Sequence, residues 1–358
     1  MLNPRKLSWT ILILLALCIK IFAVFPELVE RYYAHGIYQY ISIAQRAVLG
    51  WIPFSMGDIL YFICGLYLVR KAVLFFRAAL LKRLTLLSLI QSAKRLVYFC
   101  LLVYVVFNSL WGLNYNRLPM IEQMDMPLQP YSSELLETVL VKLVNQVNNN
   151  DSLARLNREA LKRKRTLFIK SVESYAVTGV EKPFLQYRVP SVKPSLYSYL
   201  GNYLGFTGYY NPFSGEAQVN TTVPVFVLPF TTCHEIGHQL GYAKENEANF
   251  AGFLAARTSM DPAFRYSAYF DMYSYAIREL ALRDSISAKR FQTRLRPAVK
   301  QDIKTIREFY KRFETPLEVL ISTLYGHYLK ANEQPEGIRS YNEVVAMLVA
   351  FYVKYGYV

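Results

Sequence analysis

Three long apolar stretches near the N-terminus restrict what this chain can fold into more than any other feature. They cover about residues 7–25, 51–69 and 96–113. Roughly 20 mostly apolar residues suffice to cross the hydrocarbon core of a bilayer as a helix, because a helix pairs its own backbone polar groups. We therefore expect residues 1–114 to form a membrane anchor with three transmembrane helices, and residues 115–358 to form a soluble domain.

Basic residues indicate how this anchor is oriented. Seven of them lie between the second and third apolar stretches, namely Arg70, Lys71, Arg77, Lys82, Arg83, Lys94 and Arg95. Arg5 and Lys6 precede the first stretch. Loops rich in Lys and Arg stay cytoplasmic. We therefore expect a multi-pass protein of a bacterial inner membrane whose soluble domain lies on the periplasmic, extracytoplasmic side.

The formal net charge of +15 raises the question of a nucleic-acid partner. Much of this charge lies beside the apolar stretches, where it is suited to contact anionic membrane lipid. The sequence has no helix-turn-helix signature and no basic stretch interleaved with aromatic residues. We expect membrane lipid as a partner and no nucleic acid, while the sequence gives no indication of oligomeric state.

Isolated polar residues in the first third of the chain are interpreted as structural. Residues 30–47 are a candidate interfacial helix, in which His35 is expected to be a packing residue. Asp58, near the start of the second stretch, is expected to cap or anchor a helix rather than to serve transport. Three of the four cysteines lie in the apolar stretches: Cys18, Cys64 and Cys100. No disulfide framework is possible, and Cys233 is expected to be a buried structural residue.

The remainder of the chain predicts an α+β fold that is mainly helical. Ser132, followed by apolar residues at helical spacing, predicts a capped helix that ends near Asn150, and a second helix is expected over 153–165. Residues 171–220 are rich in Tyr, Val, Gly and Pro, which favours strands and loops of a small sheet. Further helices are expected at about 231–241, 245–258, 264–283, 298–312, 316–331 and 339–354.

The pentad His234-Glu235-Ile236-Gly237-His238 carries the strongest chemical signal, and it holds two of the four histidines in the chain. Residues four apart share one face of a helix, so both imidazoles can bind one metal ion. Glu235 is rotated from His234 by about 100°, within reach of a metal-bound water, and would act as the general base. In the alternative interpretation, Thr232 and Glu235 merely form a capping box at the start of the helix.

A catalytic zinc site usually has three protein ligands and one position for water. Gly241 can end the motif helix and turn the chain. Glu245 and Glu247 then lie in the first turn of the next predicted helix, and both are candidates for the third ligand. The expected cofactor is Zn²⁺, bound by His234, His238 and one of these glutamates.

The stretch 245–249, which reads ENEAN, resembles the E-x-x-A-D/N motif that follows His-Glu-x-x-His in the gluzincins, a class of zinc metallopeptidases. This resemblance implies that Glu245 is the third ligand and that Asn249 bonds a zinc histidine in the outer shell. The step from His238 to Glu245 is shorter than in most gluzincins. A metzincin would need a third histidine where this chain has Lys244.

The whole chain also resembles an uncharacterised family of bacterial membrane proteins that have three spans and a C-terminal gluzincin-like domain. The resemblance covers residues 53–58, which read PFSMGD, the two zinc motifs, and the region from Tyr328 to Tyr341. It implies a membrane anchor followed by a zincin-like domain with an active-site helix. It implies no particular substrate.

These features predict a membrane-anchored zinc metallopeptidase that cleaves protein or peptide substrates near the membrane. Such enzymes bind an extended substrate along an edge strand before the motif helix, and the candidate segments are Gly208–Pro212 and Glu216–Val219. A downstream donor commonly stabilises the oxyanion, for which His327 and Tyr341 are candidates. The alternative is a catalytically inactive zinc-binding scaffold or sensor.

Overall fold

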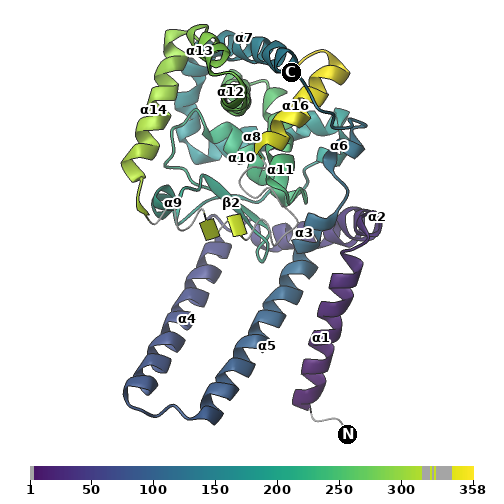
Figure 1. Cartoon of the computed structure of the whole chain (residues 1–358), viewed down its shortest axis with the longest axis vertical. Helices are drawn as coiled ribbons and strands as arrows, with labels where there is room; N and C mark the ends of the chain where they lie inside the picture. Colours follow the sequence, from purple (N-terminus) through teal and green to yellow (C-terminus); the bar gives the residue numbers. More distant parts are fainter. Residues whose placement is uncertain (1–3, 317–322, 325, 328–340) are drawn as a thin grey trace.

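Three long helices project from one side of a helical body in the computed structural model (Figure 1). They are α1 (Pro4–Phe22), α4 (Met56–Leu80) and α5 (Leu86–Leu110). α4 and α5 are each long and apolar enough to cross a membrane, and α1 with the bent segment after it makes a third if the pair counts as one span. The chain thus has the helices of a membrane protein. The structure describes residues 4–316, 323–324, 326–327 and 341–358.

Two of the spanning helices are longer than the sequence predicted. The expected spans 51–69 and 96–113 correspond to α4 and α5, which have 25 residues each. α4 starts only at Met56, because the Ser55 side chain caps it by accepting a hydrogen bond from the Asp58 N–H at 3.0 Å.

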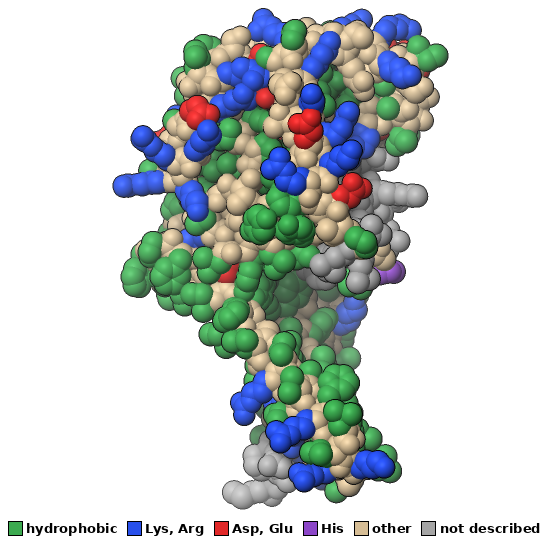
Figure 2. All heavy atoms as spheres, turned by 90° about the vertical axis from the view of Figure 1, so that its left-hand side faces the viewer, with side chains coloured by type: hydrophobic (Ala, Val, Ile, Leu, Met, Phe, Trp, Pro, Cys, Tyr) green, Lys and Arg blue, Asp and Glu red, His purple; other side chains and the backbone are tan. Residues whose placement is uncertain are grey.

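The basic residues between these spans lie mostly on the helices, and the predicted basic loop is wrong in this respect. Only Lys82 and Arg83 fall in the turn, whereas the helices carry Arg70, Lys71, Arg77, Lys94 and Arg95. Lys and Arg side chains gather toward the end of the stalk that is distant from the body (Figure 2). Long basic side chains favour helix and can extend their charge into water, so they lengthen both helices.

The segment after α1 turns sharply and runs below the body. It comprises α2 (Pro26–Leu28), η1 (Val29–Ile37) and α3 (Tyr38–Leu49), and it is bent from α1 by 104°. The buried residues of α3 include polar Ser42 and Arg46. Large exposed hydrophobic residues lie on the other side: Ile37, Tyr40 and Val48. The inward side of the expected interfacial helix therefore combines these polar residues with the fully buried Tyr38, while its outward side exposes apolar residues, which suits a lipid surface.

The body consists of helices around one hydrophobic core. In chain order they are η2 (Gly112–Asn116), α6 (Met120–Gln123), α7 (Ser133–Asn157), η3 (Arg158–Lys162), α8 (Lys164–Glu181), η4 (Pro183–Leu185), α9 (Ser198–Leu204), α10 (Leu228–Gln239), α11 (Glu245–Arg257), α12 (Pro262–Arg283), α13 (Ser285–Thr293), α14 (Pro297–Phe313) and α16 (Tyr341–Tyr355). The predicted helices near 245, 264, 298 and 339 all have a counterpart. The predicted helix 316–331 lies largely outside the described residues.

Two local predictions are wrong in this region. α7 continues to Asn157 without the predicted break, and α8 occupies residues predicted to form strands and loops. α8 is helical because its buried residues recur every three or four positions, at Leu167, Ser171, Tyr175 and Thr178. The core is built from such faces: α7 packs along α12, and α10 packs against α11.

A three-stranded sheet lies between the stalk and α10 (Figure 1). Its strands are β1 (Val192–Pro194), β2 (Gly208–Asn211) and β3 (Glu216–Val219), in the order β1-β3-β2. β1 pairs parallel with β3, and β2 pairs antiparallel with it, with Gly208 opposite Val219. Both predicted candidate segments are strands. β1 and β2 are the edge strands and β3 is central, so of the two candidate segments β2 is the one at an edge of the described sheet.

Small residues allow α10 and α11 to cross closely. A β-carbon added to Gly252 of α11 would lie 2.8 Å from the backbone nitrogen of His234, and one added to Gly237 would lie 3.2 Å from the Ala251 side chain. Both approaches are tighter than ordinary van der Waals contact. The crossing thereby brings the first turn of α11 to the histidine face of α10.

Candidate metal centre

The pentad lies in the C-terminal half of α10, not at its start. The helix begins at Leu228, and the Thr232 hydroxyl donates to the Leu228 carbonyl at 2.7 Å instead of capping. The capping-box interpretation of Glu235 is therefore excluded, and the predicted start near residue 231 is about one turn late. Cys233 is fully buried, as predicted, and its carbonyl accepts a hydrogen bond from the Tyr175 hydroxyl at 2.7 Å.

The turn after α10 orients His238. Gly241 has a φ of 87°, a conformation that glycine adopts without strain, and the Tyr242 N–H donates to the Gly237 carbonyl at 3.2 Å. This turn places the Tyr242 carbonyl 2.8 Å from His238 Nδ1. A proton on Nδ1 satisfies that carbonyl and leaves the lone pair of Nε2 free for a metal ion.

Glu245 closes the cluster from α11. Its Oε2 lies 3.4 Å from His234 Nε2 and its Oε1 lies 3.8 Å from His238 Nε2. Two ligand atoms bound to one tetrahedral zinc at 2.0–2.1 Å are about 3.3 Å apart, so the three side chains fit such an ion. Burial, and next the His238 ring, lower the pKa of His234 to about 4. At neutral pH its imidazole is uncharged, as a metal ligand must be.

Glu235 lies beside these groups and is almost inaccessible. His234, Glu235 and His238 each offer a ligand atom within 4.8 Å of the others. Glu235 Oε2 is buried without a hydrogen-bond partner among the described residues. Burial and the neighbouring Glu245 raise the pKa of Glu235. A β-carbon on Gly208 of β2 would lie 2.5 Å from Glu235 Oε1, so glycine at this position makes room for the carboxylate.

The second candidate glutamate does not join the cluster. Glu247 Oε1 accepts a hydrogen bond from the Met120 N–H at 2.8 Å, and its surroundings include Arg117. Asn249, one turn after Glu245, lies close enough to His234 to influence its pKa, although His234 Nδ1 has no hydrogen bond of ordinary geometry. The side-chain amide oxygen Oδ1 of Asn249 accepts from the Tyr275 hydroxyl at 3.4 Å.

The two candidate oxyanion donors are not placed at the cluster. His327 is described and exposed, whereas His234 and His238 keep only 13% and 8% of their side chains exposed. Tyr341 is the first residue of α16, and its side chain lies outside the described residues. The role of an oxyanion donor therefore has no assigned side chain.

Residues near the long apolar helices donate hydrogen bonds to the C-terminal end of α10, and no sequence pattern indicated this. Tyr38 and Ser42 of α3 donate to the Gln239 carbonyl at 2.8 and 3.1 Å. Trp111, which follows the last residue of α5, donates from Nε1 to the His238 carbonyl at 3.1 Å, and its ring centroid lies 6.0 Å from that of His238. The His238 carbonyl also accepts a hydrogen bond from the Gly241 N–H at 3.0 Å. The anchor region thus adds side-chain donors to carbonyls at the end of the helix, where partners within the helix are lacking.

A buried ion pair extends this connection. Arg117 donates to both carboxylate oxygens of Glu30 at 2.9 and 2.7 Å, and to the Gly241 carbonyl at 3.3 Å. Its guanidinium also stacks 4.8 Å from the centroid of the Tyr242 ring. His35, whose side chain is about half exposed, contacts the same carboxylate at 2.7 Å. The pair links η1 to the turn that orients His238.

The start of α4 is fixed to the sheet in a similar way. Glu216 of β3 is fully buried and accepts hydrogen bonds from the Gly57 N–H at 2.7 Å and the Met56 N–H at 3.2 Å. Asp58, also fully buried, accepts from the Leu196 N–H at 2.7 Å and from the Tyr209 hydroxyl. Asp58 thus anchors a helix end, as predicted. Residues on both sides of the expected boundary at 114/115 share these contacts.

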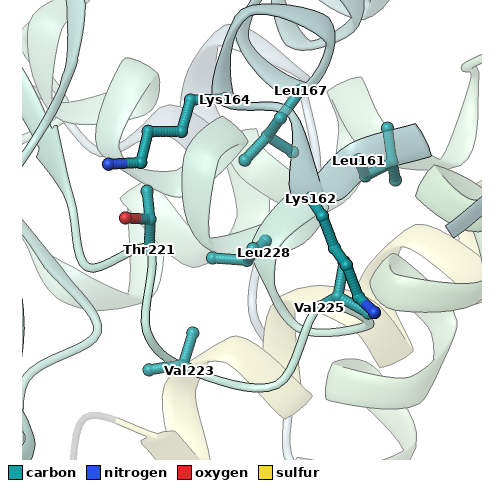
Figure 3. A pocket seen from close by; sticks show the side chains of 8 residues that line it. All are labelled: Leu161, Lys162, Lys164, Leu167, Thr221, Val223, Val225 and Leu228. Carbon is teal, nitrogen blue, oxygen red and sulfur yellow. The ribbon is translucent and has the colours of Figure 1, made fainter. Parts of the chain in front are cut away.

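A pocket of about 250 Å³ lies apart from the cluster, between η3, α8 and the segment before α10 (Figure 3). Apolar side chains line it together with Lys162 and Lys164. One of them is Leu228, the first residue of α10, and His234 lies six residues, about 9 Å, further along the helix. The pocket contains none of the candidate site residues.

Comparison with known proteins gives a family for the chain. A family model described as "Protein of unknown function (DUF3810)" matches residues 33–349, which include α3, both long apolar helices and the whole of α10 and α11. The chain belongs to this family. Comparison with curated proteins found no match, and comparison with solved structures found none. The family description carries no activity, and the comparisons do not support a gluzincin domain.

Proposed function

We propose that the protein is a zinc-dependent hydrolase in which His234, His238 and Glu245 hold the metal ion and Glu235 is the general base. The observation that carries this proposal is the approach of the Glu245 carboxylate to both imidazoles, at 3.4 and 3.8 Å. Two imidazoles and one carboxylate form the donor set of many hydrolytic zinc sites. When bound, zinc lowers the pKa of a water ligand and polarises a carbonyl group.

Glu235 is suited to move the proton in this reaction. Its carboxylate lies next to the cluster, and its Oε2 has no competing partner among the described residues. A divalent cation nearby favours the charged carboxylate and offsets the burial that raises the pKa of Glu235. As a carboxylate, Glu235 accepts a proton from the attacking water and returns it to the leaving group.

The edge strand supports a peptide as the substrate. The Asn220 N–H donates to the Thr207 carbonyl at 2.9 Å, so by the alternation of an antiparallel ladder the polar backbone groups of Gly208 face away from β3. Gly208 is partly exposed, whereas Tyr210 and Asn211 are buried. An extended peptide pairing with the Gly208 end of β2 would pass directly beside Glu235. We therefore propose a peptidase.

The position of the cluster supports an activity close to a membrane. His238 lies beside Trp111, which follows the last residue of α5, so a substrate bond would be cut close to the end of a spanning helix. Lys and Arg gather at the far end of the stalk (Figure 2). By the preference of basic residues for the cytoplasmic side, the body would face the periplasm of a bacterial inner membrane. Membrane-associated proteins and exported peptides are the corresponding substrates.

One observation favours a second function, a zinc-binding scaffold or sensor without turnover. Only 3% of Glu235 is exposed, because Gly208 of β2 covers its carboxylate. A substrate reaches this group only if it pairs with the Gly208 end of β2 or displaces it. If neither occurs, the cluster binds metal without catalysing hydrolysis.

The test is digestion of a peptide library by the full chain in detergent, with the zinc content measured on the same samples. Glu235→Gln should keep zinc and lose cleavage, while Glu247→Gln, a matched change in a glutamate outside the cluster, should keep both. Zinc without cleavage in the unaltered protein would support the scaffold. Undiminished cleavage by Glu235→Gln would contradict the role of the general base.

A further inference from the structure

α9 lies at the level where a spanning helix ends. The Leu196 N–H donates to the Asp58 carboxylate at 2.7 Å, and the Tyr197 hydroxyl donates to the Asp58 carbonyl at 2.9 Å. Asp58 belongs to the first turn of α4, whose apolar residues begin immediately after it. Leu196 and Tyr197 directly precede α9. The hydrogen bonds therefore hold α9 beside the end of α4, on the face of the body from which the stalk projects (Figure 1).

α9 and the residues before it expose large apolar side chains. Leu196 is 57% exposed, Tyr199 64% and Leu200 49%. Tyr199 and Leu200 are neighbouring residues in the first turn of α9, and Leu196 lies in the turn just before it, so these exposed side chains together make up a short apolar face. On a helix of a soluble domain such a face is packed against the core. Here it is exposed in the part of the chain that the structure describes.

The end of α14 adds basic residues to this apolar face. The Phe313 ring packs edge-on against Tyr199, at 5.8 Å between centroids, and against Tyr203 at 5.0 Å. Lys311 and Arg312 come immediately before Phe313 and are exposed. Figure 1 shows α14 descending to α9, and Figure 2 shows hydrophobic side chains around the top of the stalk. Tyrosines with Lys and Arg beside them are typical of the interface between lipid and water.

We propose that α9 and the end of α14 form a lipid-contact surface of the body. Leu196, Tyr199 and Leu200 enter the interfacial layer of the bilayer, and Lys311 and Arg312 contact anionic lipid phosphates. The bilayer is the occupant because this surface is continuous with α4. Two hydrogen bonds join them, from the Leu196 N–H to the Asp58 carboxylate and from the Tyr197 hydroxyl to the Asp58 carbonyl. Electrostatic attraction near an anionic membrane surface favours contacts of this kind for Lys and Arg.

The surface has a consequence for the candidate metal centre. α9 ends at Gly205, which has a φ of 77°, and Gly208 of β2 follows three residues later against Glu235. Contact with lipid at α9 would therefore hold the edge strand close to the membrane. This consequence rests on the proposed hydrolase, whereas the surface itself does not.

Spin labelling in nanodiscs tests the surface on the full chain and needs neither zinc nor activity. Cys18, Cys64 and Cys100 are replaced by serine, and buried Cys233 is kept. A label is attached through Leu200→Cys, or through Leu282→Cys as the control. Leu282 is 79% exposed in the last turn of α12, next to α13, which lies on the side of the body distant from the stalk (Figure 1). Collision rates with oxygen and with a water-soluble nickel chelate are compared.

In discs of phosphatidylcholine and phosphatidylglycerol, the ratio of oxygen to nickel collisions should be several-fold higher at position 200 than at position 282. Equal ratios would overturn the proposal, and so would low rates with both agents at position 200, because protein would then cover it. Lys311→Glu with Arg312→Glu should reduce the ratio at position 200 in these discs, and have less effect in phosphatidylcholine alone. An unchanged ratio in both kinds of disc would contradict the proposed contacts of Lys311 and Arg312 with lipid phosphates.

Discussion

The α4–α5 pair and the α10–α11 pair each consist of two consecutive helices, but the first pair exposes apolar residues and the second pair buries polar ones. The most apolar window of α4 has none of its residues buried, and that of α5 has 6%. In α10 and α11 nearly every residue is buried, including the charged groups Glu235 and Glu247. Exposed apolar helices are stable where lipid is the solvent. Buried polar groups persist where each has a partner or a function.

The two regions meet at the C-terminal end of α10, where residues of the anchor contact the helix that carries the pentad. Trp111, directly after α5, bonds the His238 carbonyl, and Tyr38 bonds the Gln239 carbonyl. A hydrophobic cluster that contains both aromatic residues also includes Tyr210 of β2 and Ala243. The anchor therefore forms one wall of the candidate centre. Substitutions in the anchor and in the α10–α11 pair should show whether metal binding depends on the anchor.

The largest effect is expected from the third ligand. Glu245→Gln should reduce the affinity for zinc by more than about 100-fold, because loss of an outer-shell partner alone costs 10–100-fold. Glu247→Gln, two residues along the same helix, should leave the affinity unchanged, since Glu247 bonds the Met120 N–H. Competition with a chelator of known affinity measures both. Equal losses in the two variants would contradict the assignment.

The edge strand should come next. Gly208→Ala places a methyl group against the Glu235 carboxylate, which must shift. A displacement of about 1 Å in a catalytic group costs up to about 100-fold in rate, so kcat should fall while the zinc content is kept. Gly65→Ala in α4 is the control, because a β-carbon there meets nothing within 4 Å. An unchanged kcat in Gly208→Ala would contradict a role of the edge strand in the reaction.

The buried ion pair tests whether the anchor supports the centre. Arg117→Met should lower the free energy of unfolding by about 3 kcal/mol, because it leaves the Glu30 carboxylate without its main partner. It should also weaken zinc binding by about 10-fold, through the turn that orients His238. Thermal unfolding and metal competition, both in detergent, measure the two effects. Arg31→Met on the exposed side of η1 should change neither.

A smaller effect is expected from the hydrogen bond between Trp111 and α10. Trp111→Phe retains an aromatic ring but removes the donor to the His238 carbonyl, at a cost of about 1 kcal/mol in stability. Because that carbonyl also belongs to the pentad, the zinc affinity should fall slightly. Trp9→Phe, in α1 against Tyr98 of α5, serves as the control in the spanning region. Equal changes in stability and zinc affinity in the two variants would contradict a particular role of the Trp111 hydrogen bond at the candidate centre.

The sequence predicted the local features well and the long-range features poorly. α11 begins at Glu245, where the prediction placed it, because Gly241 ends α10 and the next residues have helical spacing. α8 was missed because its valines and Tyr175 favour strands, whereas its burial follows a helical period. Arg117 gave no signal, since its partners Glu30 and Gly241 lie 87 and 124 positions away in the chain.

The most direct test of the central claim is the metal content of the purified full chain, measured by mass spectrometry for the unaltered protein and two single variants. His234→Ala removes one predicted ligand, and His327→Ala removes an exposed histidine that lies outside the cluster. The account predicts about one zinc per chain in the unaltered protein and in His327→Ala, and a large loss in His234→Ala. No metal in the unaltered protein, or full zinc in His234→Ala, would contradict it.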